Sequence, residues 1–135
     1  MMELTRKGEY AIRGIIYLAK KRVGEISLLS EIAEGTEVPP MFLAKIFQNF
    51  AKIGLISSFR GSGGGFTLNR DPSTITLREI VEAVEGPIIP NRCLLNDKGC
   101  NRAATCTVHP VWRRVQEQVS AILDGVSLAD LARDR

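Results

Sequence analysis

The sequence gathers its three cysteines and its only histidine into one short segment. Cys93, Cys100, Cys106 and His109 lie within seventeen residues, with the spacing C-x6-C-x5-C-x2-H. Thiolates and imidazole are ligands for zinc, copper and iron-sulfur clusters, and a flexible loop can wrap one metal centre with three sulfurs. His109, directly before Pro110 at a predicted helix start, is near enough in sequence to serve as a fourth ligand. The segment therefore indicates a metal centre.

Three other uses of these residues stay open. A structural zinc site accepts three Cys and one His, although such sites usually place about two to four residues between paired ligands. The gaps here are six and five residues. A catalytic Cys106 with His109 as its base would need an orienting third group and a pocket, and the sequence shows neither. The third alternative is that the cysteines bind nothing.

The redox state of these thiols depends on where the chain is expected to reside. Glu3, Arg6, Lys7 and Arg13 interrupt any apolar run near the N-terminus, so no secretory signal is predicted. No apolar run approaches the ~20 residues of a membrane span. We therefore expect a cytoplasmic location without a membrane partner, where thiols stay reduced. An odd number of reduced cysteines favours metal or redox chemistry over a disulfide framework.

Helical spacing and capping residues predict three helices in the first half of the chain. The third of them carries an apolar stripe of Leu43, Ile46, Phe47 and Phe50. Left-handed glycines are expected to end the second and third helices. The expected helices run from Thr5 to about Arg22, from a Ser27 cap to Gly35, and from Pro39-Pro40 to Gly54.

A hairpin is predicted directly after the third helix. Residues 55–59 and 66–68 read as strands, and the glycine-rich residues 60–65 read as the tip between them. Two helices joined by a short turn and followed by a hairpin with a flexible tip form the layout of a winged helix-turn-helix.

The second half of the chain supplies further helices and one long loop. Thr76 and Glu79 match a capping box before a helix that Gly86 ends, and Ser127 begins a second capping-box pattern. Pro110 is expected at the first position of a long amphipathic helix that reaches Asp124. Residues 87 to 108 show no apolar periodicity and hold the cysteines, as a functional loop would.

The expected fold is mainly α with a small β-hairpin wing. At 135 residues the chain fits one compact domain. Within it we expect a winged helix-turn-helix region over residues 1–72. Residues 73–135 would add a cluster-binding loop, about 87–109, and dimerisation helices.

Charge supports binding of a polyanion by the first region. Residues 38–70 contain no Asp or Glu, and residues 1–70 carry ten basic and six acidic side chains. Gln48 could pair with adenine, Lys45 could reach guanine or phosphate, and Arg60 at the wing tip suits a narrow minor groove. The alternative is an ordinary solvated helix face with a surface hairpin. The candidate DNA-binding residues are Ser27, Met41, Ala44, Lys45, Gln48, Lys52, Ser57, Arg60, Gly61 and Gly63.

Motifs along nearly the whole chain resemble one family. They are Leu4-Thr5 with Gly8-Glu9-Tyr10-Ala11, Gly54 to Gly61 with Gly63-Gly64-Gly65, Thr76 to Ile80, and Cys93, Cys100 and Cys106 followed by Trp112. Taken together, these motifs resemble the Rrf-two (Rrf2) family of bacterial winged-helix regulators.

The resemblance implies several further properties. It implies a homodimer paired through the helix from Pro110 to Asp124, with two recognition helices in successive major grooves of promoter DNA. It also implies a labile iron-sulfur cluster on the three cysteines, 2Fe-2S being favoured over 4Fe-4S, whose state changes DNA binding. Family members differ in the fourth ligand, for which His109 and Glu9 are the competing candidates here, His109 being favoured. Ala44 stands where one member carries an acidic base-reading residue, so the operator is not carried over.

The sequence therefore predicts a DNA-binding transcriptional regulator, expected to be a repressor, that senses redox state, nitric oxide or iron-sulfur status. No residue set for an enzyme and no organic small-molecule substrate are inferred. The alternative is a DNA-binding regulator that is metal-independent or stabilised by zinc, without redox sensing.

Overall fold

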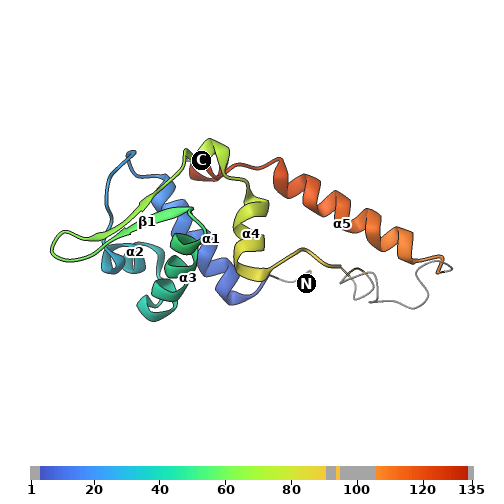
Figure 1. Cartoon of the computed structure of the whole chain (residues 1–135), viewed down its shortest axis with the longest axis horizontal. Coiled ribbons are helices and arrows are strands. Elements are labelled where there is room, and N and C mark those ends of the chain that lie inside the picture. The colour runs from blue at the N-terminus through green and yellow to red at the C-terminus, as the bar shows by residue number, and fades with distance from the viewer. Residues whose placement is uncertain (1–3, 91–93, 95–105, 134–135) are drawn as a thin grey trace.

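The structure is a computed structural model that describes residues 4–90, 94 and 106–133. Figure 1 shows the first helices and the hairpin gathered at one end, with the last long helix projecting away at the other. Over the described residues the elements are α1 (Arg6–Ala19), α2 (Leu29–Thr36), α3 (Pro40–Lys52), β1 (Ile56–Phe59), β2 (Gly65–Leu68), η1 (Pro72–Thr74), α4 (Leu77–Glu85), α5 (His109–Asp124) and α6 (Leu128–Ala132).

The helix α1 is amphipathic, as its spacing predicts. Thr5 caps it by accepting a hydrogen bond from the Gly8 backbone N–H at 3.2 Å. Its buried face includes Ala11, Ile15 and Leu18, each at most 3% exposed. The helix ends at Ala19 rather than near Arg22, because the apolar spacing stops there and the next residues are charged.

Two predicted details of α2 are wrong. Leu28, not Ser27, is the N-cap residue, and it makes no side-chain capping bond. Ser27 is instead drawn into a bridge with Phe66, where its backbone N–H and C=O pair at 2.8 Å each. The left-handed residue at the C-terminal end is Glu37, with φ 57°, not Gly35. Gly35 serves close packing, since a Cβ there would lie 2.7 Å from the Tyr17 ring.

The helix α3 carries the largest part of the core. Leu43, Ile46, Phe47 and Phe50 are at most 2% exposed, which confirms the predicted stripe. Pro40 occupies the first turn, where its missing N–H costs nothing. The helix packs on α1 so closely that a Cβ on Gly14 would meet the Phe47 ring at 2.9 Å. This packing fixes which face of α3 stays outside.

The hairpin forms the predicted wing. Its antiparallel register pairs Ile56 with Leu68 and Phe59 with Gly65. Gly65 has φ 155°, and a Cβ there would lie 2.3 Å from the Ser27 carbonyl oxygen. The bridge between Ser27 and Phe66 thus ties the wing to the start of α2.

The C-terminal elements pack back on the same core. Both predicted capping boxes are present, at Thr76 with Glu79 and at Ser127 with Asp130. Backbone hydrogen bonds of 2.8 Å join Leu77 to Val126 and Leu128 to Ile75. Ile75, Ile80 and Leu128 belong to one buried cluster with residues of α1 and α3.

The helix α5 differs from the others in how little of it is covered. It begins at His109, one residue before the predicted start, and His109 is its one buried residue. Val111 and Ile122 are 48% and 67% exposed. In the described part of the chain, no helix is long and apolar enough to cross a membrane.

Candidate nucleic-acid interface and metal centre

The outer face of α3 is polar and basic apart from Met41 and Ala44. Met41, Lys45, Gln48 and Lys52 are exposed and Ala44 is half-buried. Their spacing of three and four residues places them on one side of the helix, opposite the buried stripe. The packing of α3 against α1 therefore leaves this side open to a ligand.

The cations of the acid-free stretch divide into two kinds. Within residues 4–90, 94 and 106–133, Lys45, Lys52 and Arg60 form no ion pair. Arg70 differs, because it pairs with Glu79 of α4 at 2.7 Å. Three unpaired cations on α3 and the wing are thus free to meet phosphates, which dominate the affinity of proteins for DNA.

The wing tip presents Arg60 on a tight glycine turn. Arg60, Gly61 and Gly63 are exposed. Gly61 and Gly63 have φ values of 89° and 78°, a region that favours glycine. Ser57, lower on β1, is half-buried and donates its hydroxyl to Asn69 at 2.9 Å.

Ser27 does not share the surface formed by the other candidate DNA-binding residues. Its side chain is fully buried, and its hydroxyl oxygen has no hydrogen-bond partner in the described structure. The wing covers it through the bridge to Phe66. We therefore leave Ser27 out of the interface proposed below.

A polar network holds α2 against α1. The Tyr17 hydroxyl donates to Glu31 at 2.6 Å, and Lys21 pairs with the same carboxylate at 3.3 Å. The Tyr17 hydrogen bond and, to a lesser degree, Lys21 hold the pKa of Glu31 below its usual range. The network fixes α2, the helix that precedes α3.

Two of the four predicted metal ligands can be placed. Cys106 is half-buried just before α5, and His109 is 8% exposed at the first residue of α5. Cys93 and Cys100 lie outside the described residues. Among those that are described, no group of three or more His, Cys, Asp and Glu side chains is suited to hold a metal.

The imidazole of His109 has one buried nitrogen without a hydrogen-bond partner among the described residues. This nitrogen is Nδ1, and Nε2 lies 3.4 Å from Arg113. A buried polar atom without a partner is costly unless something absent from the structure satisfies it. His109 follows Cys106 by three residues, and its imidazole nitrogen is a suitable ligand type for a metal centre that also contains thiolates.

The other candidate fourth ligand lies on a different part of the chain. Glu9 is an exposed residue of α1. Figure 1 shows the start of α5 at the far end of the molecule from α1. Within one chain, Glu9 and His109 are therefore not brought together.

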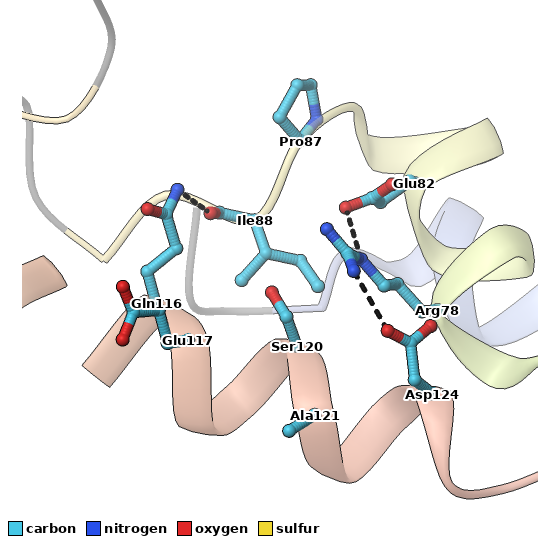
Figure 2. A pocket seen from close by; sticks show the side chains of 9 residues that line it. All are labelled: Arg78, Glu82, Pro87, Ile88, Gln116, Glu117, Ser120, Ala121 and Asp124. Atoms are coloured by element: carbon cyan, nitrogen blue, oxygen red, sulfur yellow. Dashed lines mark hydrogen bonds and ion pairs between the residues drawn. The ribbon is translucent and has the colours of Figure 1, made fainter. Parts of the chain in front are cut away.

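The contact between α4 and α5 is centred on Arg78 (Figure 2). Its guanidinium donates to Glu82 at 3.1 Å and to Asp124 at 2.9 Å, and Asp124 and Glu82 raise the pKa of Arg78. Gln116 of α5 donates to the Ile88 carbonyl at 2.9 Å. Together these residues line a pocket of about 440 Å³.

Sequence reasoning missed this contact. The partners Arg78 and Asp124 are 46 residues apart, and neither belongs to a motif that points to the other. The next residue, Glu79, holds Arg70 at the end of the wing. The first turn of α4 is thus bonded to both the wing and α5.

The fold and the exposed basic surface define a winged helix-turn-helix transcriptional regulator. The family model for Rrf2, described as an iron-dependent transcriptional regulator, matches residues 4–134. The chain belongs to the Rrf2 family.

Individual relatives agree with this assignment. The transcriptional regulator IscR of Xenorhabdus nematophila is 32% identical over 134 residues, covering 99% of this chain and 81% of the relative. The structure of CymR, the global cysteine regulator of B. subtilis, matches with a TM-score of 0.79 at 31% identity, covering 98% of this chain and 97% of CymR. IscR of T. potens matches with a TM-score of 0.74 at 27% identity, covering 96% and 85%. The matched family is one of transcriptional regulators, so this chain is a DNA-binding transcriptional regulator and not an enzyme.

Proposed function

We propose that this regulator binds promoter DNA as a homodimer and that an iron-sulfur cluster on Cys93, Cys100 and Cys106 controls the binding. The donor set supports the proposal, because thiolates are the ligands such clusters require. The similarity to IscR and the iron-dependent character of the family model support it as well. When bound, the cluster is a group that can be oxidised, nitrosylated or lost, and each of these events changes the charge and shape of its surroundings.

The proposed metal centre depends on one observation, which is that the buried Nδ1 of His109 has no hydrogen-bond partner among the described residues. We assign His109 as the fourth ligand in preference to Glu9, since it lies at the start of α5 next to Cys106. A ligand there joins the cysteine segment to α5. Binding or loss of the cluster would then change where α5 begins and how its first turn packs.

The dimer would form through α5. This helix leaves Val111 and Ile122 largely uncovered, and a second copy of the helix would bury both. Such a dimer would carry two copies of α3 and the wing. Such a pair suits a pseudo-palindromic site with half-sites one DNA turn apart.

The DNA interface would consist of α3 and the wing. We assign base reading to Gln48 and Lys45, phosphate contacts to Lys52, and a minor-groove contact to Arg60. Met41, Ala44, Ser57, Gly61 and Gly63 complete the proposed surface.

The cluster is tested by purifying the protein without oxygen. Visible absorbance, iron and acid-labile sulfide should report a cluster, and each of Cys93→Ala, Cys100→Ala and Cys106→Ala should remove the colour. Colourless protein that also fails reconstitution with iron and sulfide would overturn the metal centre. That result would favour a DNA-binding regulator that is metal-independent or stabilised by zinc.

The fourth ligand is tested by comparing two variants. His109→Ala should shift the visible spectrum and lower the iron content, while Glu9→Ala should keep both. The reverse result would assign Glu9. Unchanged spectra for both variants would show that neither His109 nor Glu9 is the fourth ligand.

A further inference from the structure

One large apolar side chain projects from the outer face of α3. Met41 is the second residue of α3 and is 81% exposed. Its neighbour Phe42 is also exposed, yet it turns toward α1, where its ring lies 6.1 Å from the Tyr10 ring. The fold therefore leaves most of this apolar side chain in contact with solvent.

The position of Met41 places it where a recognition helix reads bases. The first turn of such a helix contacts base edges in the major groove. Met41 shares one side of α3 with Lys45, Gln48 and Lys52, at spacings of four, three and four residues. An apolar residue beside two lysines that form no ion pair within the described part of the chain fits a polyanion with apolar groups better than it fits an apolar protein surface.

The major groove offers one apolar group, the 5-methyl of thymine. Methionine is unbranched and has a polarisable thioether, so it adapts its shape to such a contact. No carboxylate lies between Val38 and Arg70 in the sequence to repel the phosphates on either side.

We propose that Met41 recognises thymine by packing on its 5-methyl group in the major groove. The operator would then carry a thymine beneath the first turn of α3 in each half-site. This inference rests on the proposed promoter binding but not on the cluster.

The test uses a binding site selected from a random duplex pool with the full-length protein, purified without oxygen. Each thymine of the site is replaced in turn by deoxyuridine, which removes only the methyl. At one position in each half-site, the replacement should make wild-type protein bind the duplex about fourfold more weakly. This factor corresponds to about 0.8 kcal/mol for one buried methyl group. Met41→Ala should bind the thymine duplex weakly and be indifferent to the same replacement.

The controls separate the contact from other causes. Val23→Ala removes a fully exposed apolar side chain between α1 and α2 and should respond to deoxyuridine as wild type does. Met41→Leu should keep most of the effect. Equal sensitivity to deoxyuridine in wild type and Met41→Ala, or indifference of wild type at every thymine, would overturn the inference while leaving promoter binding intact. A wild-type protein that enriches no duplex at all would overturn the proposed function as well.

Discussion

At the scale of single residues, Arg60 has the most direct task. It is the one charged side chain of the wing tip, residues 60–65, and it forms no ion pair within the described chain. The turn around it is built from glycines, which let backbone approach DNA closely.

Reversal of this charge should disrupt binding. Arg60→Glu should weaken binding to the selected duplex by at least about tenfold in a gel-shift titration, because a cation near phosphates becomes an anion. Arg133→Glu reverses a charge after α6, where the side chain is 78% exposed and pairs with Asp130 at 3.7 Å, and should bind DNA like wild type. An unchanged titration for Arg60→Glu would remove the wing from the interface.

A second prediction for a single residue concerns the contribution of Gly65 to the free energy of unfolding. Gly65→Ala should lower the free energy of unfolding by roughly 2–3 kcal/mol, since the added Cβ meets the Ser27 carbonyl and φ 155° is strained for alanine. Gly24→Ala is the matched control, because Gly24 also has a positive φ, 83°, but has open space around it. It should cost about 1 kcal/mol. Chemical denaturation measures both, and equal losses would contradict the role assigned to the bridge.

At the scale of elements, the first turn of α4 joins the wing to α5. Arg70 at the end of the wing pairs with Glu79, and Arg78 beside it pairs with Asp124. The Arg70 hydrogen bond holds the pKa of Glu79 below its ordinary value of 4.5.

The sign of this shift gives a pH prediction. A lowered folded-state pKa stabilises the protein above the ordinary pKa, and the contribution disappears as pH falls through the folded value. Glu79→Gln keeps a side chain able to complete the capping box but loses the charge. Because the side chain is 41% exposed, the variant should lose less than about 1 kcal/mol at neutral pH. The difference from wild type should shrink as pH falls below 4.5 and vanish below the folded-state pKa, and a difference that persists at still lower pH would contradict the ion pair.

Local signals predicted most of these elements. The α3 stripe and both capping boxes depend on residues within one or two turns, so the sequence pattern contains them. Ser27 pairs with Phe66, and Gly35 near the end of α2 packs on Tyr17 of α1. Both partners lie far away in the chain or on another helix, so local sequence patterns do not indicate these contacts. The link from Arg78 to Asp124 was beyond prediction for the same reason.

At the scale of the whole molecule, the start of α5, which follows Cys106 and contains His109, and the proposed DNA interface lie at opposite ends. The start of α5 projects away from α3 and the wing, as Figure 1 shows. Residue types and spacing were enough to suggest the metal ligands, but they did not indicate this separation. The proposed control of DNA binding would therefore pass through α5 and its contact with α4, or through the partner subunit of the proposed dimer.

The most direct test of the account measures one affinity in two states. The dissociation constant for the selected duplex is determined without oxygen for the brown protein and for the same protein after a chelator has removed the iron. We expect the dissociation constant to change by at least about tenfold, or about 1.4 kcal/mol of coupling, and Cys106→Ala to match the iron-free value. Identical constants for a protein shown to contain iron and sulfide would contradict control by the cluster.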